Sequence, residues 1–426
     1  MEIALLFGVF AVLLVLGVPI AFALSVSALA AVLALGLPPI VVVQQVSAGF
    51  NKVSLLAIPL FIFTGELMMR GGISDRLIAL ASSLVGHLRG GLGQVSVVAS
   101  TMFGGVSGSA LADVSAIGPT MIPQMAKRGF SKDYAVDVTI SAALVALLLP
   151  PSHNLILFSA VAGGGVSIAD LFAAGIVPAL MLALSVMGAA YWLARVRGYP
   201  TETFPGFGAI ASRFVAAIPG LLMIFVIFGG IRAGIFTAVE SSAIAVLYAV
   251  AVTLVVYRSL GWKDFSGAAA HAARAAATVL FVIGAAGAFG WLIAYLEIPG
   301  FVVETLNGMT QDKNVALLSM VLALLIMGTF LDLAPKIIIV TPIFLPVARA
   351  YGVEPLHFGV IMVLAGGIGL ITPPIGSVLF VGSAIGRISV AEAMKSIWPF
   401  YLAALTVLLL VTYIPALSLA LPAVWR

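Results

Sequence analysis

The chain contains no cysteine and very few charged residues, and each absence removes a class of function. Without cysteine there is no disulfide bond, no cysteine-ligated iron–sulfur cluster and no thiol nucleophile. Only 8% of the 426 residues are charged, whereas a soluble domain carries about 25%. So few charges cannot cover a surface against water, and we therefore expect lipid to surround most of this chain.

Long apolar stretches are what the sequence has instead. Hydrophobic residues make up 62% of the chain, and a membrane-spanning helix needs roughly 20 apolar residues in succession. Candidate stretches are Val53–Met69, Tyr134–Ala162, Leu171–Ala194, Phe214–Gly230, Thr237–Tyr257, Ala275–Leu296, Val315–Leu331 and Trp398–Leu421. Strands of a membrane barrel would alternate apolar and polar residues, and these stretches do not. The sequence thus predicts an all-α polytopic membrane protein.

The two ends of the first half are less sharply defined. Residues 2–34 are apolar and lack a basic leader and a convincing cleavage site, which favours a retained membrane segment over a signal peptide. The sequence leaves open whether this segment crosses the membrane once or twice. The longest predicted loop runs from Arg195 to Arg213, too short for a soluble domain, and its basic residues indicate the cytoplasm.

An internal repeat emerges when the sequence is shifted by 223 positions. At this one offset Pro119 aligns with Pro342, Pro123 with Pro346, Gly129 with Gly352, and Pro150–Pro151 with Pro373–Pro374. Loop charges then orient the two copies, because basic loops stay in the cytoplasm. The loop at 127–132 is basic while its counterpart at 349–354 is balanced, whereas 163–170 has no cation and its counterpart at 387–395 has two. This reversal predicts an inverted repeat, which is typical of secondary transporters.

The predicted organisation follows from that repeat. The first repeat covers residues 1–195, a cytoplasmic linker covers 196–213 and the second repeat covers 214–426. In each repeat an apolar stretch is interrupted near its middle, at about 94–126 and 315–350. Arms of about 15 residues are too short to span the bilayer unaided. Two re-entrant helical hairpins are therefore predicted, since irregular backbone at membrane depth must face protein or a polar cavity.

Each repeat also contains a helix interrupted by two consecutive prolines, at about 134–162 and 356–386. Two prolines remove two helical hydrogen bonds and break the helix. The freed carbonyls and nearby hydroxyls are oxygen ligands that suit a hard cation such as sodium, and helix N-termini at the same break favour an anionic group. The symmetric pairing of breaks and hairpins predicts a solute site rather than two isolated kinks.

At these residues the sequence resembles the large membrane subunit of the tripartite ATP-independent periplasmic (TRAP) transporters. The matching segments are Phe103–Asp113, Leu149–Ser152, Asp170–Pro178, Asp332, Thr341–Pro346, His357–Met362 and Gly369–Gly376. The resemblance implies a sodium-coupled, elevator-type importer of a small organic acid (a C4-dicarboxylate, sialic acid or sugar acid) in the bacterial inner membrane. It also implies a small TRAP membrane subunit and a periplasmic substrate-binding protein as partners, with no cofactor besides sodium.

Two alternative functions are compatible with parts of the sequence. The continuation Ser152-His153-Asn154 departs from the commoner Ser-Ile-Pro and is similar to that of sialic-acid-type members. A stand-alone sodium/carboxylate carrier of the same superfamily is the main alternative. An intramembrane serine protease is the enzyme alternative, because residues 105–108 match Gly-x-Ser-Gly and His153 offers a base. The repeat and the double prolines favour a carrier, so no catalytic residue is assigned.

Candidate site residues lie at the hairpin tips and the facing breaks. Predicted sodium-site residues are Ser107, Gly108, Ser109, Pro150, Pro151 and Ser152 in the first repeat, and Asp332, Pro335, Gly367, Thr372 and Pro373 in the second. Predicted substrate-site residues are Ser152, His153, Asn154, Lys336, Gly376 and Ser377. Lys336 aligns with Asp113 and is predicted either to attract a carboxylate or to snorkel toward the headgroups. Glu66 is interpreted as a structural acid or an ion-path residue, and Asp137 as an acid that opens a helix.

Overall fold

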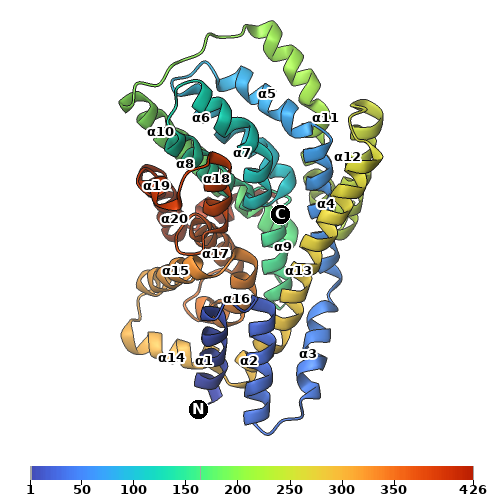
Figure 1. The fold of residues 1–426 in the computed structure, drawn as a ribbon. Helices are drawn as coiled ribbons and strands as arrows, with labels where there is room; N and C mark the ends of the chain where they lie inside the picture. The colour runs from blue at the N-terminus through green and yellow to red at the C-terminus, as the bar shows by residue number, and fades with distance from the viewer. Residues whose placement is uncertain (1, 164, 426) are drawn as a thin grey trace.

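The computed structural model describes residues 2–163 and 165–425, and all regular secondary structure in those residues is helical (Figure 1). Seven helices are long and apolar enough to cross a membrane, or eight if the bent pair α20–α21 is one span. The predicted all-α membrane protein is therefore confirmed.

The bounds of the helices are as follows. The first half has α1 (Glu2–Val15), α2 (Ile20–Ala34), α3 (Ile40–Phe50), a 3-10 turn η1 (Val53–Leu56), α4 (Ala57–Arg70), α5 (Ile73–Val85), α6 (Gly91–Ser107), α7 (Ala110–Lys127), α8 (Lys132–Ala143), a 3-10 turn η2 (Leu144–Leu147), α9 (His153–Val161) and α10 (Ile168–Val196). The second half has α11 (Phe207–Arg232), α12 (Ala238–Ala251), a π segment η3 (Val252–Val256), α13 (Trp262–Tyr295), α14 (Ile298–Met309), α15 (Lys313–Phe330), α16 (Leu333–Ala350), α17 (Pro355–Leu370), α18 (Ser377–Gly386), α19 (Val390–Ala393), α20 (Trp398–Tyr413) and α21 (Ala416–Trp425).

The N-terminal segment forms two short helices rather than one long one. α1 has 14 residues and α2 has 15, and the two pack against each other. At about 1.5 Å per residue each is only about 22 Å long, which is less than the roughly 30 Å hydrocarbon core. The turn between them contains Gly17, whose φ of 77° lies in the left-handed region that glycine adopts without steric cost.

Helix α13 is the element around which α2, α3 and α4 pack (Figure 1). Its 34 residues span about 51 Å at about 1.5 Å per residue. Small residues let α3 and α13 approach closely, as is common between membrane helices. A Cβ added at Gly49, Gly284 or Gly287 would lie 3.1, 2.3 or 2.7 Å from the opposing helix.

The connection between α10 and α11 is shorter than the predicted loop, since the two helices leave only residues 197–206 outside them. Arg197 pairs with Asp133 at 2.9 Å, and the Tyr199 hydroxyl accepts a hydrogen bond from the backbone N–H of Ser131 at 3.2 Å. The connection is thus fastened to the turn between α7 and α8. The two loops predicted to be cytoplasmic lie together at one face of the protein.

The helix arms that flank the interrupted stretches are longer than predicted. α6 and α7 have 17 and 18 residues, and α15 and α16 have 18 each. Both α15 and α16 count among the candidate spans, so the expectation that every arm is too short is wrong for the second pair. The longer arms arise because α15 and α16 continue, as helix, up to residues 331–332 on either side of the break.

Candidate functional site

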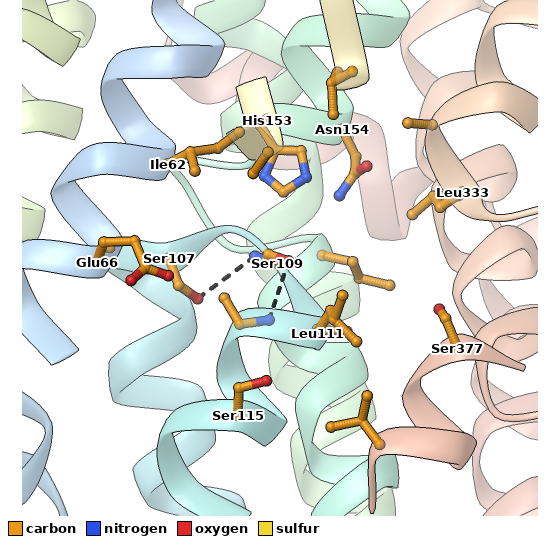
Figure 2. A pocket seen from close by; sticks show the side chains of 18 of the residues that line it. Ile62, Glu66, Ser107, Ser109, Leu111, Ser115, His153, Asn154, Leu333 and Ser377 are labelled. Carbon is orange, nitrogen blue, oxygen red and sulfur yellow. Dashed lines mark hydrogen bonds between the residues drawn. The ribbon is translucent and has the colours of Figure 1, made fainter. Parts of the chain in front are cut away.

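A cavity of about 430 Å³ lies where the two interrupted stretches and the two proline breaks come together (Figure 2). Its lining includes Ser107, Ser109 and the start of α7 at one tip, and Asp332 with the start of α16 at the other. His153 and Asn154 of α9 and Ser377 of α18 also line it. Six predicted site residues thus share one cavity, namely Ser107, Ser109, His153, Asn154, Asp332 and Ser377.

The turn between α6 and α7 is pressed directly against the first proline break. Gly108 has φ 59°, and an added Cβ would lie 2.2 Å from the carbonyl oxygen of Pro151. Only glycine fits this left-handed, crowded position. The Asn154 amide, itself part of the cavity wall, donates to the Gly108 carbonyl at 3.4 Å. The tip and the break are therefore in direct contact.

Serine side chains complete the first tip. The backbone N–H of Ser109 donates to the Ser107 hydroxyl at 3.5 Å, and the Ser109 hydroxyl caps α7 by accepting from Ala112 at 3.3 Å (Figure 2). Ser152 is buried and is not part of the cavity lining. Its hydroxyl donates to the Leu147 carbonyl at 2.5 Å and accepts from Leu155 at 3.4 Å, so it bridges the break.

The second break is held to its own tip by a different set of contacts. The Ile375 N–H donates to the Thr329 carbonyl at 3.0 Å, and the Ser377 hydroxyl donates to Asp332 at 3.2 Å. The Thr372 hydroxyl donates to Ile368 at 2.7 Å. Backbone oxygens converge beside Gly376, because a Cβ there would lie 2.8 and 2.9 Å from the carbonyl oxygens of residues 370 and 372.

The other predicted residues lie behind the cavity wall. Gly108, Pro150, Pro151, Ser152, Pro335, Lys336, Gly367, Thr372, Pro373 and Gly376 are not part of the lining. Both proline pairs are joined by cis peptide bonds. Lys336 is fully buried, and its ammonium donates to the Gly366 carbonyl at 3.1 Å. It therefore does not snorkel, because the slot between α15 and α17 encloses the whole side chain.

Three polar side chains form the opposite wall, and the sequence analysis singled out only one of them, Glu66. Glu66 and Arg70 of α4 and His271 of α13 all line the cavity. Glu66 Oε1 lies 2.8 Å from His271 Nδ1, and Glu66 Oε2 lies 3.5 Å from Arg70 Nε. The spacing of Glu66 and Arg70, four residues apart on one helix face, was a usable signal. Nothing in the sequence around His271 indicated its place.

Two further buried acids lie in the helices next to the cavity. Asp113 accepts a hydrogen bond from Ser100 at 2.6 Å, and its second oxygen has no partner among the described residues. Asp137 accepts a hydrogen bond from Ser396. The prediction that Asp137 opens a helix is wrong, because α8 begins at Lys132 and Asp133 is the acid in its first turn.

Curated proteins with similar sequences include uncharacterized proteins and large permease proteins of TRAP transporters. The uncharacterized protein YgiK of Salmonella typhimurium is 40% identical over 424 residues, covering 99% of this chain and 97% of that one. The large permease protein of the C4-dicarboxylate TRAP transporter of Rhodobacter capsulatus is 34% identical, with 99% of both chains covered. The large permease protein of the sialic acid TRAP transporter of Vibrio cholerae is 34% identical, with 96% of both covered.

A solved structure has the same fold at low sequence identity. The YdaH transporter of Alcanivorax borkumensis superimposes with a TM-score of 0.61 and 16% identity, covering 87% of this chain and 86% of that one. In sequence, residues 7–417 match the family described as the DctM component of the tripartite ATP-independent periplasmic transporter. The relatives of this chain that are named by function are permeases rather than enzymes. The chain therefore belongs to the DctM family of TRAP transporter large membrane subunits.

Proposed function

We propose that this chain is the translocating subunit of a sodium-coupled importer for a small organic acid in the bacterial inner membrane. The observation that carries the proposal is the cavity itself. It is lined from both halves of the chain by hydroxyl, amide and imidazole groups and by residues of both interrupted stretches. At about 430 Å³ it falls within the roughly 300–1,000 Å³ of typical small-molecule sites.

The cavity wall offers one arginine for a carboxylate, and acidic and amide groups for hydroxyls. Arg70 is the cation of the wall, and its terminal guanidinium nitrogens have no hydrogen-bond acceptor among the described residues. A guanidinium fork matches the geometry of a carboxylate. Asp332 and Asn154 offer groups that recognise hydroxyls or an amide. A C4-dicarboxylate, sialic acid or related sugar acid fits this chemistry, and the relatives named above carry such substrates.

Two oxygen-rich places, one at each tip, are the candidates for binding the coupling cation. The first has the hydroxyls of Ser107 and Ser109 beside the Pro151 carbonyl, as the crowding at Gly108 indicates. The second has Asp332 and the carbonyls that converge beside Gly376. Sodium is a hard cation that prefers such ligands, and transporter coupling ions bind where helices are unwound.

An elevator movement is proposed from the way the helices group. α2, α3, α4, α12 and α13 lie along one side of the protein, whereas the hairpins and broken helices lie on the other (Figure 1). The cavity lies between the two groups, since α4 and α13 form one wall. Sliding of one group against the other would carry the cavity across the membrane. The 223-residue offset supports an inverted repeat as the basis of that movement.

Partners are proposed from the family. A small TRAP membrane subunit and a periplasmic substrate-binding protein would complete the transporter, with the binding protein delivering the acid. The alternative is a stand-alone sodium/carboxylate carrier. The two differ in whether uptake needs the binding protein.

Uptake into liposomes tests this function. The chain and its small subunit are reconstituted, and the cognate binding protein is loaded with radiolabelled succinate or N-acetylneuraminate. Accumulation driven by an inward sodium gradient, and absent with potassium or without the binding protein, is the expected result. Accumulation without the binding protein would indicate the stand-alone carrier. Equal uptake with and without sodium would refute sodium coupling.

A further inference from the structure

Lys336 is a fully buried lysine that the proposed transport site does not use. It lies in the first turns of α16, and its ammonium donates to the carbonyl of Gly366 in α17 at 3.1 Å. The slot exists because glycines line it. A Cβ on Gly328 would lie 2.7 Å from the Lys336 nitrogen, and a Cβ on Gly366 would lie 3.3 Å from it. The ammonium thus occupies a space between α15 and α17 that the absence of side chains at Gly328 and Gly366 leaves open.

This slot is a favourable place for a positive charge. Gly366 belongs to the last turns of α17, which ends at Leu370, and the C-terminal end of a helix carries a partial negative charge. Asp332 is the residue just before α16, four positions before Lys336, and its carboxylate adds a negative charge near the ammonium. A buried ammonium is costly unless such groups surround it. The surroundings of Lys336 are those of a cation site whose cation is attached to the protein.

The equivalent position in the first half carries the opposite charge. Asp113 aligns with Lys336 at the offset of 223 residues and is fully buried one turn beyond Ser109. One of its oxygens accepts from Ser100, and the other has no partner among the described residues. A buried acid with an unused oxygen attracts a cation toward the first tip. The two tips therefore differ by two units of charge at this position when both groups are ionised.

We propose that the ammonium of Lys336 takes the place of a coupling cation at the second tip, so that the chain binds sodium at the first tip only. This inference rests on the sodium coupling proposed above and fixes the number of ions. Gly366 precedes Gly367, which the sequence analysis assigned to the second sodium site. A sodium ion there would face the positive charge of protonated Lys336 in a medium of low dielectric constant, where like charges repel strongly.

Direct sodium binding tests the inference without any substrate. The full chain with its small subunit is placed in lipid nanodiscs, and bound ²²Na⁺ is counted per chain at saturation for wild type, Lys336→Met and Lys313→Met. Methionine is uncharged and of similar length, so it fills the slot. Lys313 is the matched control, because its ammonium also donates to a carbonyl, that of Gly352 at 2.8 Å, but it is exposed.

The expected result is one sodium ion per chain in wild type and Lys313→Met, and two in Lys336→Met. Two ions in the wild type, or one in a folded Lys336→Met protein, would overturn the inference while leaving sodium coupling intact. No bound sodium in any of the three proteins would refute the proposed sodium coupling as well. If Lys336→Met does not fold, Lys336→Gln removes the same charge with a polar side chain, and two ions are again expected.

Discussion

Glu66 Oε1 lies 2.8 Å from Nδ1 of His271, and this contact joins α4 to α13 at the cavity wall. α4 comes from the first half of the chain and α13 from the second. The other carboxylate oxygen of Glu66 lies 3.5 Å from Arg70 Nε, so the acid holds the guanidinium by one nitrogen. Arg70 lines the cavity, and its guanidinium lies beside Gly267 of α13, so its terminal nitrogens are the groups that we expect a substrate carboxylate to bind.

The first prediction concerns Arg70. Replacement by glutamine should raise the substrate concentration for half-maximal uptake about 10- to 100-fold, because a hydrogen bond to a charged group contributes about 1.5–3 kcal/mol and 1.4 kcal/mol is a factor of ten. Uptake assays in liposomes measure it. Arg232→Gln is the control, since that guanidinium lies 5.7 Å over the ring of Trp425 and does not line the cavity. Equal effects of both changes would contradict the role of Arg70.

The second prediction concerns Gly108. Alanine there should destabilise the protein and abolish uptake, because the left-handed backbone costs about 1–2 kcal/mol and the Cβ, 2.2 Å from the Pro151 oxygen, adds about 1–3 kcal/mol of overpacking. Gly129→Ala is matched in backbone, with φ 86°, but has nothing within 4 Å. Thermal unfolding in detergent should therefore show a clearly smaller loss for Gly129→Ala. Identical losses would mean that the contact between tip and break is unimportant.

The parts of the site that could be predicted from the sequence are those set by the backbone conformation of the residue itself. The breaks at Pro150–Pro151 and Pro373–Pro374 were predictable because proline lacks an N–H wherever it lies. Gly108 was predictable because a glycine between serines interrupts an apolar helix. Local constraints of this kind need no knowledge of the partner helix.

Residues that act across helix interfaces were not predictable in the same way. His271 reaches the cavity only because α13 packs against α4. Lys336 was expected to face the site or the headgroups, and the glycines of two other helices instead enclose it. Asp137 was predicted to lie at a helix start because the apolar stretch was taken to begin at Tyr134, whereas α8 begins at Lys132. In each case the packing of distant segments decides the environment, and one sequence alone does not contain it.

The third prediction separates the two tips by their sodium dependence. Ser107→Ala should raise the sodium concentration for half-maximal uptake, because loss of a ligand hydroxyl costs about 1–3 kcal/mol, or about 5- to 100-fold. Thr372→Ala should leave it unchanged, since the Thr372 hydroxyl is already bonded to the Ile368 carbonyl and Lys336 supplies the positive charge at that tip. Sodium titration of uptake measures both. A shift in Thr372→Ala equal to that in Ser107→Ala would favour two sodium sites.

The last prediction is the orientation of the two halves. The cysteine-free sequence allows single cysteines to be introduced at two exposed positions beside the symmetry-related loops, as Lys127→Cys at the end of α7 and Glu354→Cys before α17. If the repeat is inverted, a membrane-impermeant maleimide should label Lys127→Cys only from the cytoplasmic side and Glu354→Cys only from the opposite side. The basic residues around Lys127 favour the cytoplasm, whereas the loop at Glu354 balances its charges and is free to cross. Labelling of both cysteines from one side would exclude the inverted repeat, and with it the symmetric movement by which one cavity is exposed to each side in turn.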